Sequence, residues 1–265
     1  MVVIAKHEPL LRQLGLTTLD QVKAFRGELI KDHKGRRDIF RVAAKGDDGQ
    51  AHIFFLKRNW RPYKKDGLIS LLRRGKVWSI ARQEWENSRG LEGAGLHVAG
   101  LVAYGEELGP LWEKFSFITT EAACGQTLEQ FLQECRERTQ RRRVFDALAR
   151  EVRRMHDAGL AAPDLFTRHI FVDVVRGEAK FCFIDLARLD RPKELSTPRR
   201  ARDLAALNVT APLRFVSARE RVRFLKIYAG GFDRNLARLI GQRTAHLLKR
   251  NRFRAFGAPS AVPAQ

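Results

Sequence analysis

The stretch AAPDLFTRHIFVDVV, residues 161–175, decides the fold. It places Asp164 directly after a proline, puts His169 five positions later, and begins an alternating apolar run at Ile170. Pro-Asp is a common turn pair, and alternation of apolar and polar residues is typical of a strand. The preceding segment RRRVFDALAREVRRMHDAG has apolar residues at helical spacing. The pattern predicts a loop between a long helix and a strand, with an aspartate and a histidine on that loop.

Three further charged residues extend this constellation. Asp185 ends the strand expected in FCFIDLARL, Lys57 closes the apolar run IFFL, and Glu84 lies on the helix expected for residues 76–93. Phosphoryl transfer from ATP needs a metal ion held against the phosphates, a lysine on those phosphates, and a base that positions the attacking hydroxyl. The order of these residues along the chain matches that requirement.

We therefore predict a role for each residue. Lys57 binds phosphates, and Glu84 orients it through an ion pair. Asp164 positions the acceptor hydroxyl. Asp185 and His169 hold the metal ion, because His169 stands where a kinase catalytic loop has its metal-binding asparagine.

Plainer interpretations exist for the same residues. Lys57 could be only a solvent-exposed lysine at the end of a strand. Asp164 and Asp185 could each only cap a turn. Glu86 competes with Glu84 as the partner of Lys57, but Glu84 lies beside the apolar stripe of its helix and is preferred.

Outward from this constellation, the chain divides into two parts. The segment HEPLLRQLGLTTLDQVKAF predicts a short helical start, and an antiparallel meander is expected next. The segments HVAGLVAYGEE and WEKFSFITTE resume strand character, whereas the chain after Glu121 is mostly helical. We expect an α+β, two-lobed fold with a sheet-and-helix lobe over residues 1–119 and a helical lobe over residues 120–265. The strands of the meander are expected around 29–31, 39–43 and 53–56, and two further strands at 170–174 and 180–184.

The motifs FFLKRNW, ARQEWENSRGLEGAGLHV, MHDAGLAAPDLFTRHIFVD and FIDLARL together resemble a protein-kinase-like fold. Specifically, the chain resembles the bacterial lipopolysaccharide kinase (Kdo/WaaP) family, which phosphorylates heptose or Kdo in the lipopolysaccharide core. The resemblance spans about Leu10 to Phe253. In that family a histidine commonly stands five residues after the catalytic aspartate, which implies that His169 lies on the metal or phosphate side.

The resemblance also implies a nucleotide site. The turn HKGRRD around Gly35 would present backbone N–H groups to phosphate. Thr119 to Ala123 would form the hinge that meets adenine, with Thr120, Glu121, Ala122 and Ala123 as the binding residues. Asp203 either braces the catalytic loop or only begins a helix.

Three departures from the family pattern stand out. Ala162 replaces the polar residue expected two positions before the catalytic aspartate, DLAR replaces D-F-G, and no G-x-G-x-x-G is present. A histidine ligand also suits softer ions than Mg²⁺. We therefore expect ATP with Mg²⁺ as cofactor, with Mn²⁺ able to support activity, and loss of activity as His169 protonates.

The charge predicts an anionic partner. The chain has 50 Lys and Arg against 30 Asp and Glu, a net charge of +20 and a pI near 10.7. A lipopolysaccharide precursor and the anionic inner-membrane surface both fit this charge. Nucleic acid is not expected, because the aromatic residues sit in apolar runs rather than between basic residues.

The sequence also favours a reducing compartment. Cys124, Cys135 and Cys182 form an odd set without a C-x-x-C pair. No run reaches the roughly 18 apolar residues of a membrane span, and the start is interrupted by charge too early for a secretory signal. We expect a cytoplasmic protein, peripheral at the inner membrane.

Two other functions remain open from sequence. A kinase fold could serve a protein or small-molecule acceptor, or a degenerate kinase-like fold could act only as a binding module. The presence of Lys57, Glu84, Asp164 and Asp185 argues against the second.

Overall fold

The computed structural model describes residues 1–46, 49–60, 62, 70–71 and 75–250. The chain forms two compact units. The first contains Met1–Gly90 and Ala99–Ala123, and the second contains Leu91–Val98 and the chain from Cys124 onward. The expected division after residue 119 falls inside a strand of the first unit, and the segment Leu91–Val98 joins the second unit instead.

The first unit is built on a sheet that, within the described residues, has six antiparallel strands in the order β1-β5-β6-β4-β3-β2. The described helices of this unit include η1 (Ala5–His7), α1 (Glu8–Gln13), α2 (Leu19–Ala24) and most of α4 (Ile80–Gly93). The strands are β1 (Val2–Val3), β2 (Glu28–Asp32), β3 (Arg37–Lys45), β4 (Ala51–Asn59), β5 (Leu101–Leu108) and β6 (Glu113–Glu121).

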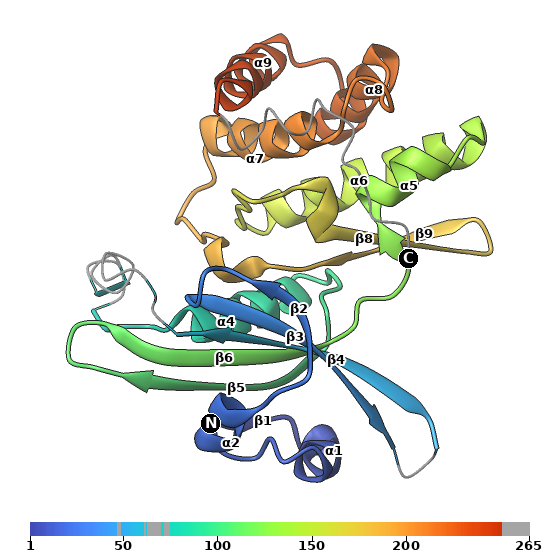
Figure 1. The fold of residues 1–265 in the computed structure, drawn as a ribbon. Coiled ribbons are helices and arrows are strands. Elements are labelled where there is room, and N and C mark those ends of the chain that lie inside the picture. The colour runs from blue at the N-terminus through green and yellow to red at the C-terminus, as the bar shows by residue number, and fades with distance from the viewer. Residues whose placement is uncertain (47–48, 61, 63–69, 72–74, 251–265) are drawn as a thin grey trace. The chain divides into compact units, whose positions relative to one another are not determined.

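The two faces of this sheet carry different side chains, because successive residues of a strand point to opposite faces. Phe40 pairs with Leu56, and both are buried in a core shared with α1 and α2. Lys57 pairs with Ile118 on the other face, where Trp85 of α4 packs. Figure 1 shows α4 on one side of the sheet and α1 and α2 on the other. The register therefore delivers Lys57 to the face that α4 covers.

The second unit is mostly helical and holds a small antiparallel sheet, β7-β8-β9, among the described residues. Its largest buried cluster is apolar and draws on every long helix of the unit. The elements are β7 (Gln126–Thr127), α5 (Leu128–Glu134), α6 (Arg138–Asp157), η2 (Thr167–His169), β8 (Ile170–Val175), β9 (Glu178–Phe183), η3 (Leu186–Arg188), α7 (Thr197–Thr210), α8 (Ala218–Ala229) and α9 (Arg234–Leu248).

Side-chain caps fix where the helices begin. The hydroxyl of Ser217 accepts a hydrogen bond from the N–H of Glu220, whose carboxylate accepts from the Ser217 N–H, a capping box at the start of α8. Arg141 of α6 donates to the same carboxylate at 3.1 Å. Burial raises the pKa of Glu220, but the hydrogen bonds from Ser217 and Arg141 outweigh it, so this pKa is lowered from its ordinary value.

The structure confirms the predicted antiparallel meander, the helical start and the strand pair after the loop of Asp164. The helix expected over residues 76–93 begins only at Ile80, so Trp78 precedes it. Asp185 does not end a strand: β9 stops at Phe183, and Asp185 adopts the left-handed conformation before η3. No described helix is long and apolar enough to cross a membrane.

Candidate active site

Lys57 and Glu84 form a buried ion pair in the first unit. The ammonium Nζ lies 2.6 Å from Glu84 Oε1, and the side chains are 11% and 5% exposed. This contact follows from the sheet register, which points Lys57 toward α4, and from the apolar stripe of α4, which turns Glu84 toward the sheet. The alternative partner Glu86 is two residues along the same helix. A charge-assisted contact of this kind holds the lysine in one orientation.

The turn predicted to cradle phosphate connects β2 to β3. Lys34 and Gly35 both have positive φ, 55° and 68°, which is the conformation of a tight two-residue hairpin turn. The N–H of Gly35 donates to Asp32 Oδ1 at 2.9 Å, and the N–H of Arg36 donates to the carbonyl of His33 at 3.1 Å. These N–H groups are thus used inside the turn, and the role of Gly35 in phosphate binding stays a prediction.

The predicted hinge is the end of β6 and the residues after it. Thr120 is buried in the strand. The N–H of Glu121 donates to the carbonyl of Gly100 at 2.7 Å, and the N–H of Ala122 donates to the carbonyl of Ile53 at 2.9 Å. The N–H of Ala123 makes no hydrogen bond to the described residues, and adenine binding by Thr120 to Ala123 stays a prediction.

In the second unit, the loop that carries Asp164 is fixed at its start. Ala161 exchanges two 2.8 Å backbone hydrogen bonds with Asp190. The N–H of Ala162 donates to Asp203 Oδ2 at 2.6 Å, and Asp203 is fully buried on α7. Asp203 therefore contacts the loop that carries Asp164, and the side chain of Ala162 packs in the apolar core.

A buried histidine and a tyrosine support Asp203. His156, at the end of α6, has Nε2 3.4 Å from Asp203 Oδ2 and Nδ1 2.7 Å from the hydroxyl of Tyr228 on α8. His156 thus lies between Asp203 on α7 and Tyr228 on α8. Its Nε2 makes no hydrogen bond to the described residues, so the bond to Tyr228 is the stronger of its two contacts.

Asp164 lies beside an arginine that sequence reasoning did not single out. Arg188 NH1 lies 2.9 Å from Oδ1 and 3.0 Å from Oδ2 of Asp164. Arg188 is the last residue of the DLAR segment, which the sequence analysis had noted. Its contact with Asp164, 24 positions earlier, could not be predicted from the sequence. Asp164, His169, Asp185 and Arg188 line one small hollow of about 10 Å³.

The hairpin of β8 and β9 brings His169 and Asp185 together. Ile170 pairs with Phe183, so the residues that flank this pair, His169 and Ile184, are also neighbours. His169 Nε2 lies 3.7 Å from Asp185 Oδ2. The left-handed φ of Asp185, 58°, is uncommon outside glycine and tolerated best by Asn and Asp. The local register, rather than sequence spacing, creates this pair.

The hydrogen bonds of His169 define its protonation. Nδ1 lies 3.0 Å from the backbone carbonyl of Asp164, and a carbonyl only accepts, so Nδ1 carries the proton. Nε2 is then the acceptor, and Arg168 Nε donates to it at 3.1 Å. Burial lowers the pKa of His169 from 6.5 and outweighs the nearby Asp185, so the ring is neutral at pH 7.

These features fit a metal ligand in part. Metal-binding imidazoles typically donate their other N–H to a carbonyl or carboxylate, as His169 does. However, no group of three or more His, Cys, Asp or Glu that could hold a metal occurs in the described part of the chain. A divalent cation on His169 Nε2 and Asp185 would displace the N–H of Arg168 and take its other ligands from phosphate and water, as Mg²⁺ commonly does.

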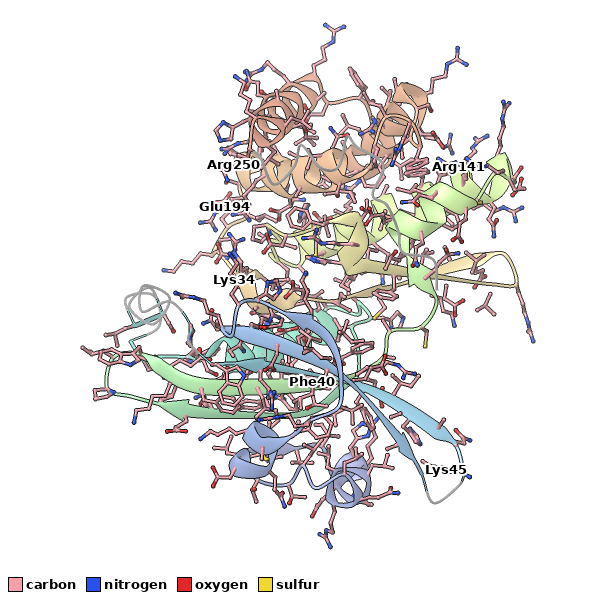
Figure 2. All side chains as sticks on the ribbon, in the orientation of Figure 1. Lys34, Phe40, Lys45, Arg141, Glu194 and Arg250 are labelled. Carbon is pink, nitrogen blue, oxygen red and sulfur yellow. The ribbon has the colours of Figure 1, made fainter. Side chains whose placement is uncertain are left out.

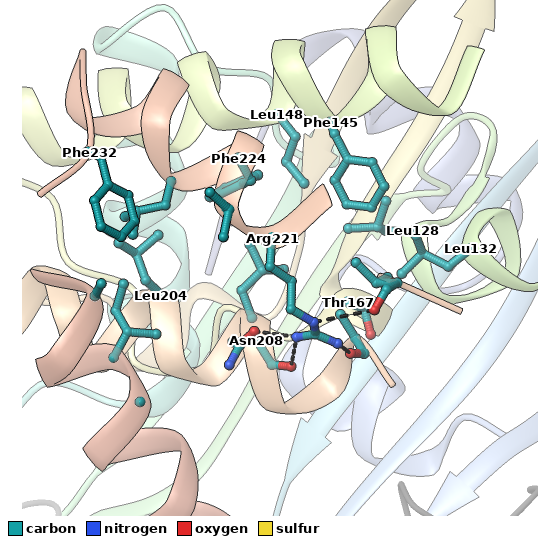
Figure 3. A pocket seen from close by; sticks show the side chains of 18 residues that line it. Leu128, Leu132, Phe145, Leu148, Thr167, Leu204, Asn208, Arg221, Phe224 and Phe232 are labelled. Atoms are coloured by element: carbon teal, nitrogen blue, oxygen red, sulfur yellow. Dashed lines mark hydrogen bonds between the residues drawn. The ribbon is translucent and has the colours of Figure 1, made fainter. Parts of the chain in front are cut away.

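The second unit also contains an apolar cavity of about 280 Å³ between α5, α6, α7, α8 and α9. Figure 3 shows Leu128, Leu148 and Phe224 among the side chains that line it, with Arg221 as its main polar group. Arg221 donates to both oxygens of Asn208 and to the carbonyl of Ala211. The cavity is therefore a site for aliphatic rather than charged groups.

A basic groove adjoins this cavity. Phe145 lines both, and the groove has a volume of about 640 Å³. Glu220 is its one acidic lining residue among those described. The arginines that line it are Arg136, Arg138, Arg141, Arg142, Arg214, Arg219 and Arg223. Arg141, labelled in Figure 2, lies on α6.

Residues 20–228 match the family described as "Lipopolysaccharide kinase (Kdo/WaaP) family". The chain belongs to this lipopolysaccharide kinase family. The lipopolysaccharide core heptose(I) kinase WaaP of Pseudomonas aeruginosa is 32% identical over 227 residues, 81% of each chain. The protein of the same name from Escherichia coli is 25% identical over 224 residues, 81% of this chain and 82% of that one.

A solved structure described as "WaaP in complex with acyl carrier protein" is similar with a TM-score of 0.67 and 29% identity. The match covers 92% of this chain and 98% of that one. These findings confirm the resemblance found in the sequence, the two-lobed α+β kinase-like fold and the assignment to the kinases. A carrier protein was not among the predicted partners.

Proposed function

We propose that the chain transfers the γ-phosphate of ATP to a heptose hydroxyl of the lipopolysaccharide inner core. The choice of heptose as the acceptor rests on one observation. The chain is 32% identical, over 81% of each chain, to a relative named as a core heptose(I) kinase. The ion pair of Lys57 and Glu84 and the grouping of Asp164, His169 and Asp185 support the phosphoryl transfer.

Each residue has a part in the proposed reaction. Lys57, held by Glu84, binds ATP phosphates, and Ala123 offers its N–H to adenine. Asp164 accepts a hydrogen bond from the attacking hydroxyl and aligns it with the γ-phosphorus. Asp185 and His169 hold a divalent cation, which when bound neutralises phosphate charge.

The choice of acceptor is tested with a panel of defined sugars. The protein is incubated with ATP, Mg²⁺ and either a dephosphorylated heptose-containing core or an acceptor that ends in Kdo, and each product is weighed by mass spectrometry. We expect the mass of one phosphate group on the heptose acceptor only. Phosphate on the Kdo acceptor alone would identify Kdo as the substrate instead of heptose. No gain in mass on either sugar would refute the proposal.

The metal requirement is tested separately. Imidazole suits Mn²⁺ better than Mg²⁺, so both ions support activity in this proposal. His169→Ala should reduce turnover with both, and more severely at limiting metal concentration. Full activity of this variant with each ion would remove His169 from the metal site.

We also propose that the chain binds an acylated acyl carrier protein. The similar solved structure is described as a complex with acyl carrier protein, and this chain has an apolar cavity that adjoins a groove of arginines. The acyl chain would enter the cavity while the carrier protein contacts the groove. The cavity volume, about 280 Å³, is close to the lower end of ligand pockets, roughly 300 Å³.

Pull-down with acylated and unacylated carrier tests this partner. Arg142→Glu and Arg219→Glu should each weaken capture, because both side chains are exposed in the groove. Arg243→Glu, on the exposed face of α9, is the matched control and should bind normally. Equal capture by all three variants would remove the groove from the interface.

Peripheral binding to anionic membrane is the third part of the proposal. The net charge of +20 favours it, since each well-placed Lys or Arg gains about 1 kcal/mol at such a surface. We expect sedimentation with phosphatidylglycerol vesicles that is lost at high salt and absent with phosphatidylcholine. Salt-insensitive binding, or none to either vesicle, would contradict this.

A further inference from the structure

Arg37 lies beside the buried ion pair of the first unit. It begins β3, directly after the turn formed by Lys34 and Gly35. Arg37 pairs with Asn59 across the sheet, and the next pair on the same face is Ile39 with Lys57. Arg37 and Lys57 therefore project from the same face, on adjacent strands.

The two cations share one carboxylate. Lys57 lies 2.6 Å from Glu84 Oε1, and Arg37 NH2 lies 4.0 Å from Glu84 Oε2. The second distance is longer than a hydrogen bond, and Oε2 accepts no hydrogen bond from the described residues. The carboxylate of Glu84 thus lies between the ammonium of Lys57 and the guanidinium of Arg37.

A hollow lies beside Arg37. Its volume is about 530 Å³, and Lys34, Arg36 and Arg37 supply three cations to its lining against the carboxylate of Asp32. Figure 2 shows Lys34 at the turn between β2 and β3. Asn59 is also among the lining residues, so the hollow continues from the turn onto the sheet face.

The turn itself has few N–H groups to offer an anion. Those of Gly35 and Arg36 donate to Asp32 and His33. A glycine-rich loop binds phosphate through backbone N–H groups, so this chain needs another source of positive charge. A guanidinium suits the purpose, because it can donate two parallel hydrogen bonds to a phosphate.

We propose that Arg37 is a second nucleotide-phosphate-binding residue of this chain, acting beside Lys57 in place of a glycine-rich loop. The proposal rests on the proposed use of ATP and adds to it a residue that the sequence analysis did not name. The two-residue turn sets where β3 starts, and the buried Glu84 holds the guanidinium near the lysine. The ligand class is a nucleoside di- or triphosphate.

The test compares ATP, ADP and adenosine as ligands in calorimetric titrations of the full chain. Arg37→Gln should weaken ATP and ADP by about 10- to 100-fold, the value of a charge-assisted hydrogen bond, and leave adenosine unchanged. Arg41→Gln is the matched control: it lies on the same strand but pairs with Glu28 at 2.9 Å, away from the turn. This control should bind all three ligands as the wild type does.

Two further measurements separate phosphate binding from a structural role. Arg37→Lys keeps the charge and should recover part of the ATP affinity, whereas a packing role would not respond to charge. Lys34→Ala, at the exposed turn, should weaken ATP less than Arg37→Gln and should not affect folding. If Arg37→Gln does not fold, the affinities of Arg37→Lys and Lys34→Ala for ATP relative to adenosine decide the question.

The outcomes distinguish this inference from the proposed function. A wild type that binds no ATP overturns both. A wild type that binds ATP, together with an Arg37→Gln variant of unchanged affinity, overturns the role of Arg37 and leaves the kinase reaction intact. An equal loss for adenosine and ATP also overturns it, because the effect would then not concern phosphate.

Discussion

The ion pair of Lys57 and Glu84 predicts an asymmetry between its two partners. At an effective dielectric constant of about 20, the Coulomb attraction across the 2.6 Å contact is about 6 kcal/mol, and across the 4.0 Å contact of Arg37 about 4 kcal/mol. Desolvation offsets much of both, and removing one partner of a buried pair costs about 3–5 kcal/mol.

The geometry decides which substitution costs more. Lys57→Met leaves Arg37 near Glu84, so it should lower the free energy of unfolding by about 3 kcal/mol, the lower end of this range. Glu84→Gln removes the shared carboxylate and leaves two neighbouring cations, so its cost should lie near the upper end, about 5 kcal/mol. The double substitution should be more stable than Glu84→Gln alone, since it removes one of these cations.

Urea denaturation followed by tryptophan fluorescence is the assay. It reports on the first unit, because all four tryptophans lie there: Trp60, Trp78, Trp85 and Trp112. Arg41→Gln, at a pair 37% and 56% exposed, is the control and should cost under about 1 kcal/mol. A larger cost for Lys57→Met than for Glu84→Gln, or strictly additive costs, would refute the reasoning. All three variants of the pair should lack kinase activity, including the double substitution.

Three further predictions concern residues of the second unit. Asp203→Ala should destabilise the protein by about 1–3 kcal/mol and lower kcat, because it leaves the buried N–H of Ala162 without its acceptor. Urea denaturation and steady-state kinetics check this, and an unchanged free energy of unfolding and kcat would contradict it. Burial alone would raise the pKa of Glu220, but the hydrogen bonds at the start of α8 lower it, so its contribution to stability is present above about pH 4.5 and lost as pH falls through the lowered pKa. Melting curves should therefore show a deficit for Glu220→Gln at pH 7 that shrinks toward pH 3, and a deficit independent of pH would be the opposite result. Burial raises the pKa of Cys182 to about 12, so iodoacetamide at pH 8 should label the exposed Cys124 and spare Cys182 until the protein is unfolded, and equal labelling in the native state would show this wrong.

Much of the fold was legible from local patterns. Alternation and a compact apolar run predicted the meander, although its third strand continues past Lys57 to Asn59. Helical spacing placed Glu84 on the face of α4 that meets the sheet. The loop that carries Asp164 was predicted because a helix, a Pro-Asp turn and a strand follow one another along the chain. These features depend on residues close in sequence, where propensity and periodicity carry the information.

The contacts that escaped prediction join residues far apart in sequence. Arg188 reaches Asp164 only because the β8–β9 hairpin folds back on the loop. The contact of His156 with Tyr228 depends on how α8 packs against α6. The assignment of Leu91–Val98 to the second unit likewise follows from packing, since Leu91 and Leu96 lie in its apolar core.

The chemistry of Asp164 tests the central claim most directly. Wild type and Asp164→Asn are mixed in single turnover with ATP labelled at the γ-phosphate, Mg²⁺ and a dephosphorylated heptose-containing core, and the label on the sugar is followed in time. The account predicts rapid transfer by the wild type, and a variant that binds ATP with wild-type affinity but transfers almost no label. Transfer by Asp164→Asn at the wild-type rate, or label released by the wild type only as free phosphate, would contradict it.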